Sequence, residues 1–343
     1  MLRRGDSNNP GTLVISLDFE LHWGIRDQVS IARYRDNLLG VRQAIPALLD
    51  LFTRYDIHAT WATVGFLFFE SREELLRGLP SRIPRYADAN LSPYPIVSSI
   101  GESEADDPFH FAPSLLRLIA DTPGQEIGTH TFCHYYCEED GQTADDFRAD
   151  LDAACRVATR YGVQLRSIVF PRNQVNGEYL AVCREFGLAA YRGNASCEFW
   201  KGSTVREESG WKRMLRLADS YLPIAPTLSY QLSPDEACKP VNVRASRFLR
   251  PYSPRLWRFE PLRLRRIKNE LSYAAERGEI YHLWWHPHNF GANLEENVTF
   301  LELVLQHFNS LRDKFEMTSR SMGEAAETRG PNIAETVAIG AAR

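Results

Sequence analysis

The sequence has few cysteines, no long apolar run and no strong excess of charge. Its six cysteines lack the dense spacing of small secreted domains, so we expect reduced thiols. The first twenty residues hold no apolar secretion signal, and no later run approaches the length of a membrane span. A net charge of −4 disfavours general nucleic-acid binding. We therefore expect a cytoplasmic protein.

The sequence does contain enough apolar residues for a large folded core. Hydrophobic residues make up 44% of the 343 positions and charged residues 24%, as in globular proteins. This length suits one large α/β barrel or two ordinary domains. We predict a single barrel domain over residues 1–327, with a long excursion at about 78–112 that is rich in Pro, Ser and Tyr. Residues 328–343 are predicted to be a loose tail.

Short apolar runs alternate with helical patterns along the chain. The predicted strands are 12–17, 58–65, 125–127, 166–170, 188–191, 279–285 and 314–318. The predicted helices are 37–55, 114–120, 143–161, 178–186, 260–277 and 297–309. Such alternation implies a parallel sheet, and we predict an irregular seven-stranded (β/α) barrel. An open doubly wound sheet also fits, although no glycine-rich phosphate loop follows the first strand.

Two carboxylates follow the first predicted strand. The strand is almost continuously apolar, as expected when both faces are buried, and Asp18 and Glu20 come directly after it. Alternate residues at a strand end point to the same side. Carboxylates this close to an apolar strand are unfavourable unless they are paired or bind a metal ion. The simpler alternative is a solvated strand end before a helix cap.

A pair of histidines follows the third predicted strand. His130 and His134 are four residues apart, which on a helical turn places both imidazoles on one face, as zinc ligands require. An amphipathic helix with one packed and one solvated histidine fits the same spacing. Cys137 cannot join His130 on one ion, because seven helical residues rise roughly 10 Å. Other segments must therefore complete any metal site.

Two later predicted strands also end in polar residues. Arg172 and Asn173 follow strand 166–170, and His286 and His288 follow strand 279–285. Because catalytic groups of a (β/α) barrel gather at the carboxyl ends of its strands, we expect these side chains near Asp18 and Glu20.

In their order along the chain, these motifs resemble the polysaccharide deacetylase family, the divalent-metal carbohydrate esterases built on an irregular seven-stranded (β/α) barrel. The resemblance runs from about Leu13 to about Met322. It rests on Ser16-Leu17-Asp18-Phe19-Glu20, Thr129-His130-Thr131-Phe132-Cys133-His134, Phe170-Pro171-Arg172-Asn173 and Trp285-His286-Pro287. Two motifs depart from the common pattern, since many members have adjacent aspartates and an Arg-Pro order.

The resemblance implies a metal-dependent hydrolase that removes an acetyl group from an acetylated sugar. Glu20, His130 and His134 would hold a divalent ion, with Zn²⁺ the first candidate. Asp18 would be the base, His286 the acid, and Arg172 the residue that keeps Asp18 ionised, unless Arg172 pairs with Asp18 only structurally. A metal-dependent glycoside hydrolase or another C–N amide hydrolase on the same barrel stays open. A sugar-binding module without catalysis is disfavoured, because every candidate side chain is present.

The expected substrate is a saccharide precursor of a surface polysaccharide, linked to a nucleotide or a lipid. The segment Arg244–Lys268 holds nine basic residues and one acid, with aromatic residues between them. It is either a solvated helix whose arginines pair with acids elsewhere or a surface for an anionic carrier. The second interpretation includes peripheral contact with the inner membrane face. The sequence leaves the oligomeric state open.

Overall fold

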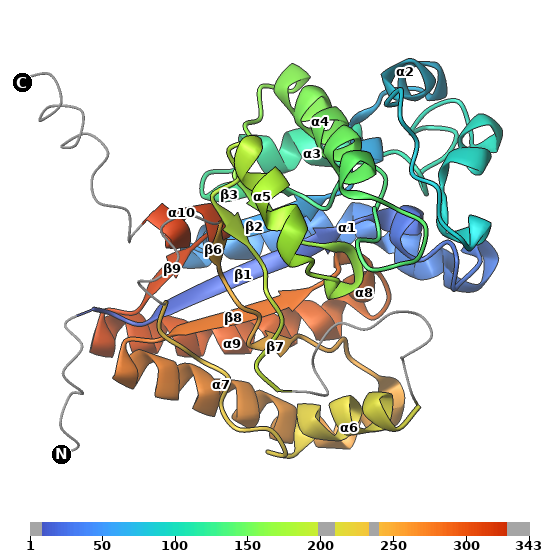
Figure 1. The fold of residues 1–343 in the computed structure, drawn as a ribbon. Helices are drawn as coiled ribbons and strands as arrows, with labels where there is room; N and C mark the ends of the chain where they lie inside the picture. The colour runs from blue at the N-terminus through green and yellow to red at the C-terminus, as the bar shows by residue number, and fades with distance from the viewer. Residues whose placement is uncertain (1–8, 198–209, 233–239, 328–343) are drawn as a thin grey trace, which may run out of the picture.

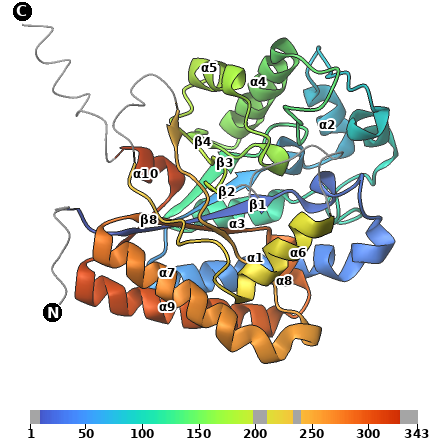
Figure 2. The ribbon, with the colours of Figure 1, turned by 60° about the horizontal axis from the view of Figure 1, so that its bottom comes forward.

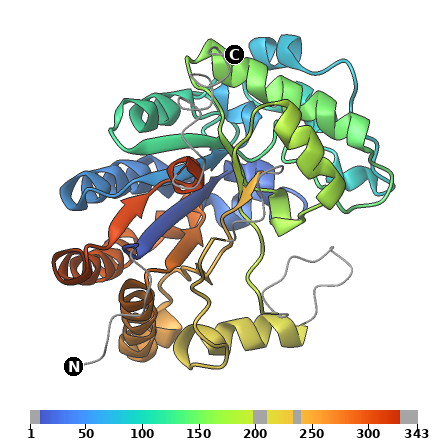
Figure 3. The same cartoon turned by 60° about the vertical axis from the view of Figure 1, so that its left-hand side comes forward.

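The computed structural model describes residues 9–197, 210–232 and 240–327. In this part of the chain the strands form one sheet that curls into an open barrel, with helices packed around it (Figures 1 and 3). The strand order is β6-β5-β4-β3-β2-β1-β8-β7, with β9 paired to β1, and all these pairings are parallel. The predicted (β/α) barrel is therefore confirmed.

The strands are β1 Thr12–Phe19, β2 Ala59–Thr63, β3 Gln125–Thr129, β4 Ser167–Ile168, β5 Ala190–Tyr191, β6 Val241–Asn242, β7 Arg247–Phe248, β8 Ile280–Trp285 and β9 Thr318–Arg320. The helices are α1 Ile31–Tyr55, α2 Arg72–Gly78, α3 Pro113–Asp121, α4 Ala144–Arg160, α5 Gly177–Glu185, α6 Gly210–Tyr221, α7 Glu260–Arg277, α8 Pro287–Gly291, α9 Leu294–Phe315 and α10 Met322–Glu327. Helices α7 and α9 lie side by side against the β8 side of the sheet (Figure 2).

The sheet has nine strands rather than the seven predicted. The additional strands β6 and β7 are two residues long, too short to produce a periodic apolar pattern. The predicted strand 314–318 was misplaced, because α9 continues to Phe315 and ends at Glu316 in the left-handed conformation (φ 60°). The last strand begins only at Thr318.

The two faces of β1 have different surroundings. Leu13, Ile15 and Leu17 pack in the main core, whereas Val14 on the other face packs in a separate cluster inside the barrel. Because side chains alternate along a strand, Asp18 lies on the same face as Val14. The alternation therefore directs its carboxylate into the barrel.

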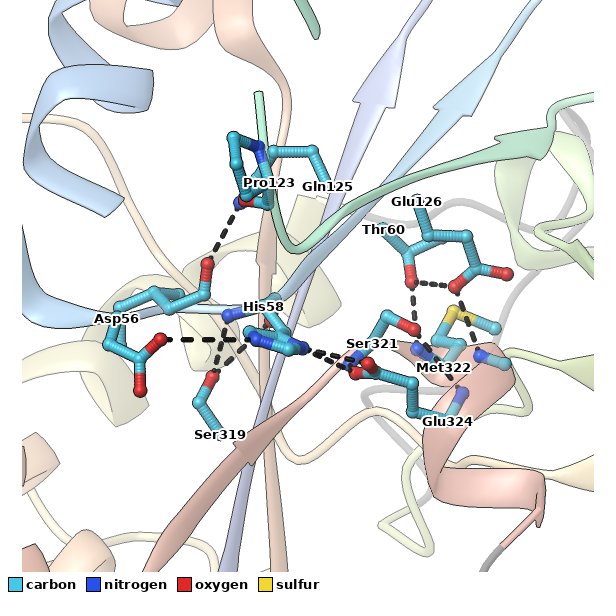
Figure 4. Close-up of polar contacts among 12 residues, drawn as sticks. Asp56, His58, Thr60, Pro123, Gln125, Glu126, Ser319, Ser321, Met322 and Glu324 are labelled. Atoms are coloured by element: carbon cyan, nitrogen blue, oxygen red, sulfur yellow. Dashed lines mark hydrogen bonds and ion pairs between the residues drawn. The ribbon is translucent and has the colours of Figure 1, made fainter. Parts of the chain in front are cut away.

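Helix α10 packs on the apolar cluster inside the barrel through Met322, Ala325 and Ala326. Figure 4 shows the polar contacts beside it. The N–H of the fully buried Met322 donates to Thr60 Oγ1 (2.8 Å), and the Thr60 hydroxyl donates to Glu126 Oε2 (2.7 Å). Nearby, His58 Nδ1 lies 2.8 Å from the Glu324 carboxylate. These contacts hold α10 against β2 and β3, and the polar strand ends gather at the opposite end.

The basic segment Arg244–Lys268 is divided between the interior and the surface. Three of its arginines are buried and paired with acids: Arg247 and Arg266 with Asp219 and Glu270, and Arg263 with Glu260. A buried, paired arginine cannot reach a phosphate group or a bilayer. The predicted carrier or membrane contact is therefore wrong for these three residues. The exposed arginines of the segment are Arg255, Arg258 and Arg265.

Other sequence-based expectations concern the cysteines, the membrane and the tail. The five cysteines that the structure describes are free thiols, and Cys238 lies outside the described residues. In the described ranges, no helix is both long enough and apolar enough to cross a membrane. The predicted tail, residues 328–343, also lies outside them.

Candidate active site

Five of the six predicted site residues come together at the carboxyl end of the barrel. Glu20, His130 and His134 each offer a ligand atom, and these atoms lie within 4.8 Å of one another. His286 Nε2 lies 3.6 Å from Glu20 Oε1 and 3.8 Å from Asp18 Oδ2. The ends of β1, β3 and β8 therefore meet at one site.

The Glu20 carboxylate lies between the two histidines. Its Oε2 atom is 3.3 Å from His130 Nε2 and 3.1 Å from His134 Nε2, and all three side chains are buried. Gly24 makes this arrangement possible, because a Cβ atom at that position would lie 2.0 Å from Glu20 Cδ. A residue with a side chain at position 24 would push the carboxylate away from the histidines.

The two histidines lie on a loop and not on the helical turn that their spacing suggested. Thr131 and His134 both have left-handed backbone conformations (φ 64° and 61°), which a helix does not contain. Asp150 of α4 holds the loop by accepting hydrogen bonds from the N–H groups of Phe132 (2.7 Å) and Cys133 (3.1 Å). A buried carboxylate on a neighbouring helix thus positions the imidazoles.

The three side chains fit a divalent metal ion. His130 Nδ1 lies 2.8 Å from the carbonyl oxygen of Val169, so Nδ1 donates to it and Nε2 is left as a lone-pair ligand facing Glu20. Burial lowers the pKa of His134 to about 4, although Glu20 opposes the shift, so this imidazole is neutral at pH 7. Two imidazole nitrogens and one carboxylate form a ligand set typical of catalytic zinc.

Asp18 is paired with an arginine that the sequence analysis did not select. Arg192 donates from Nη1 to Asp18 Oδ1 (2.6 Å) and from Nη2 to Asp18 Oδ2 (2.7 Å). Its Nη1 also donates to Ser16 Oγ (3.0 Å), and its guanidinium stacks 4.1 Å from the Trp284 ring. Arg192 directly follows strand β5, so the same strand-end rule that identified the other candidates could have found it.

Arg172 does not contact Asp18, and the predicted pairing of these two residues is wrong. Arg172 forms an ion pair with Asp27 and lies 4.2 Å above the Tyr136 ring. Its backbone is left-handed (φ 55°), within the turn Pro171–Asn173 that follows β4. Arg172 therefore borders the histidine loop through Tyr136, whose ring contacts His134.

Neighbouring residues keep both site carboxylates ionised. Burial by itself would raise the pKa of Asp18, but its interaction with Arg192, with smaller contributions from His130 and His286, holds that pKa below its usual value. Burial opposes ionisation of Glu20 in the same way, and its three histidine neighbours hold the pKa of Glu20 well below the usual range. Two ionised carboxylates can thus coexist in a site with little water.

His286 and His288 have different surroundings. The His286 side chain is 23% exposed and lies at the open side of the site, where it can reach a bound substrate. His288 stacks on it with ring centroids 4.9 Å apart, but it is buried, and burial lowers its pKa to about 3. His288 is therefore not a surface residue, and its neutral ring forms part of the support for His286.

The end of the predicted excursion supports the acidic turn. The turn η1, Leu21–Gly24, directly follows Glu20, and Trp23 Nε1 in it donates to the carbonyl oxygen of His110 (2.8 Å). The His110 ring lies between His22 (3.2 Å) and Asp107 (2.7 Å). The segment before α3 thus anchors the turn that presents Glu20.

A small hollow lies beside Arg192, which contacts two of its lining residues, Asn173 and Trp284. Arg192 Nη2 donates to Asn173 Oδ1 (2.9 Å) at its border. Its lining includes two amides and two aromatic rings: Asn173, Asn194, Phe248 and Trp284. The rings of Phe248 and His286 are 6.2 Å apart, so the hollow opens beside the histidine that faces the substrate side.

Comparisons with known proteins connect the chain with one family. A family model for polysaccharide deacetylase matches residues 34–191, which include the histidine loop. Over this range the chain is similar to the polysaccharide deacetylases. The match supports deacetylation as the kind of reaction. Asp18, Glu20 and His286 lie outside the matched range, and their assignment depends on the geometry described above.

Two solved structures are similar to this chain over nearly its whole length. A Mycobacterium smegmatis protein assigned to the polysaccharide deacetylases has a TM-score of 0.56 and 14% identity over 98% of this chain and 95% of its own. A Pseudomonas aeruginosa PAO1 protein with the same assignment has a TM-score of 0.52 and 12% identity over 92% and 89%. At such identities the likeness concerns the fold. No curated protein matches the chain by sequence.

Proposed function

We propose that this protein is a metal-dependent deacetylase that hydrolyses the acetyl amide of an acetylated amino sugar. The observation that carries the proposal is the convergence of Glu20, His130 and His134 beside an ionised Asp18. A zinc ion on these three ligands would polarise the acetyl carbonyl and lower the pKa of water toward roughly 7.

The residues around this centre have separate roles in the proposal. Asp18, ionised and held by Arg192, accepts the proton of the attacking water. His286 lies on the exposed side and donates a proton to the departing sugar amine. Burial of Asp18 and Glu20 excludes bulk water, which strengthens their interactions with developing charge.

The side chains near Arg192 support a saccharide as the substrate. Amide groups such as Asn173 and Asn194 suit sugar hydroxyls, and the rings of Phe248 and Trp284 suit the apolar face of a pyranose. We further propose a nucleotide- or lipid-linked precursor, as the sequence suggested. The cytoplasmic location stays a prediction.

The test is acetate release by zinc-loaded protein from acetylated amino-sugar precursors, compared with Asp18→Asn and Glu20→Gln. We expect Asp18→Asn to keep its zinc and lose nearly all turnover, because an amide cannot accept the proton. Glu20→Gln should lose zinc. Release of new reducing ends without acetate would identify a glycoside hydrolase instead. If Asp18→Asn loses the zinc and Glu20→Gln retains it, the two assigned roles are reversed.

A further inference from the structure

Exposed apolar side chains gather on one surface, which does not include the residues of the proposed site. The described part of the chain exposes twelve large apolar side chains, and seven of them belong to this surface. They are Trp211, Met214, Leu222, Ile224, Trp257, Phe259 and Leu262. We call this the α6–η7 surface, after helix α6 and the turn η7, Pro254–Phe259.

The two segments of the α6–η7 surface pack against each other. Tyr221 of α6 and Phe259 of η7 have ring centroids 6.1 Å apart, and α6 also packs against α7. The buried Asp219 of α6 pairs with Arg247 and Arg266, which ties α6 to the barrel. Figures 1 and 3 show α6 at the edge of the molecule, beyond α7. The apolar residues are thus presented on a supported platform.

The same surface is strongly basic, whereas the whole chain carries a net charge of −4. Residues 210–232 and 240–268 hold twelve basic side chains and two acids, Asp219 and Glu260. Three of the twelve, Arg247, Arg263 and Arg266, are buried and do not contribute to the surface. Both acids are already paired with arginines of these segments. The exposed basic residues beside the apolar ones are Arg213, Arg255, Arg258 and Arg265.

We propose that the α6–η7 surface docks onto an anionic lipid bilayer. Tryptophan and phenylalanine rings lie favourably at the headgroup level, where exposed apolar groups leave water. Arginines beside them attract anionic headgroups. A two-fold contact with a second copy would instead place two basic surfaces against each other. A nucleic acid would satisfy the arginines but would leave most of the aliphatic side chains in water.

Docking there would place the proposed active site near the bilayer. Phe248, whose ring contacts His286, precedes the first residue of η7, Pro254, by only six positions. If the proposed function holds, a lipid-borne saccharide would meet the site directly. The docking itself does not depend on deacetylation, so it is tested by binding alone.

The test is flotation of the full chain with vesicles of phosphatidylcholine, with and without phosphatidylglycerol. We expect binding only to the anionic vesicles, with loss at high salt. Trp211→Ser with Trp257→Ser, and separately Arg213→Glu with Arg258→Glu, should each weaken partitioning about tenfold or more. Leu118→Ser with Leu303→Ser and Arg77→Glu with Arg160→Glu, which are exposed elsewhere, are matched controls and should bind like the unmodified chain.

Three results would overturn the docking proposal. One is equal binding to neutral and anionic vesicles. Another is binding that the α6–η7 variants leave unchanged while circular dichroism shows them folded. The third is absence of flotation combined with a dimer that light scattering detects. If Trp211→Ser with Trp257→Ser dissociates that dimer, the surface binds a second copy of the chain. Acetate release measured on a soluble sugar in parallel keeps failure of docking distinct from failure of the deacetylase proposal.

Discussion

Arg192 holds Asp18 through two parallel hydrogen bonds of 2.6 and 2.7 Å, although 174 residues separate them in the chain. Both side chains are buried, so the pair is shielded from water and from salt. The guanidinium is itself fixed by Ser16 and by the Trp284 ring. Asp18 therefore has one orientation and one charge state before any substrate binds.

Replacing Arg192 should disable the base. We expect Arg192→Lys to lower kcat/KM by about 10²-fold or more, because lysine cannot reproduce the bidentate contact. Arg192 lowers the pKa of Asp18, so Arg192→Gln should raise that pKa and move the acidic limb of the pH–rate profile to higher pH. In the matched control Arg172→Lys, kcat/KM should fall by less than about threefold. A larger fall in kcat/KM for Arg172→Lys than for Arg192→Lys would show that Arg172 is the arginine that supports the base.

Removing either histidine ligand should remove the metal. We expect dialysed His130→Ala and His134→Ala to contain no stoichiometric zinc by atomic emission, because only two protein ligands remain. His307→Ala is the control, since this ring contacts Ser272 and the Lys268 carbonyl oxygen elsewhere. Full zinc occupancy in either of the first two variants contradicts the ligand set.

His286, rather than His288, should be the proton donor of the site. His286→Ala should lower kcat by about 10²-fold or more while its zinc is retained, because no other partly exposed imidazole faces the site among the described residues. His288→Ala should lower kcat less, since its buried neutral ring acts only as support. Steady-state kinetics and zinc analysis of both variants make the comparison, and a larger loss of kcat in His288→Ala would reverse the assignment.

His282 should make stability depend on pH. This buried ring accepts from Ser16 Oγ at Nε2, and burial lowers its pKa to about 3. Below the unfolded pKa of about 6.5 the unfolded chain binds a proton that the folded chain does not, so stability falls as pH falls. The cost at pH 5 is about 2 kcal/mol. In denaturant unfolding, the His282→Gln variant should lose less free energy of unfolding between pH 8 and pH 5 than the unmodified chain. The same pH dependence in both proteins would show that His282 is not its cause.

Asp150 should control the position of the histidine loop. Asp150→Ala leaves the buried N–H groups of Phe132 and Cys133 without their acceptor. We expect a loss of roughly 2–5 kcal/mol in the free energy of unfolding and about 10-fold to 100-fold weaker zinc binding. Asp152→Ala, on the exposed side of the same helix, is the matched control and should change neither by much. Unaltered zinc affinity in Asp150→Ala would show that the histidine loop keeps its conformation without Asp150.

Much of the architecture follows from local sequence patterns. The helix predicted over 260–277 has those bounds in α7, and the apolar runs before Asp18 and His286 form β1 and β8. Apolar periodicity predicts these elements because each one buries a stripe or a face of its own residues. The two-residue strands β6 and β7 were not predicted, because their formation depends on pairing with adjacent strands and not on their own sequence.

The sequence by itself determined which residue types stand at the strand ends, and so indicated Asp18, Glu20, His130, His134 and His286. Only the tertiary structure decided which arginine meets Asp18. Arg172 and Arg192 both follow short strands, but the left-handed backbone of Arg172 accompanies its pairing with Asp27, whereas the curl of the sheet carries Arg192 across the barrel. Local patterns record burial and strand ends, whereas contacts across a barrel depend on how the whole sheet closes.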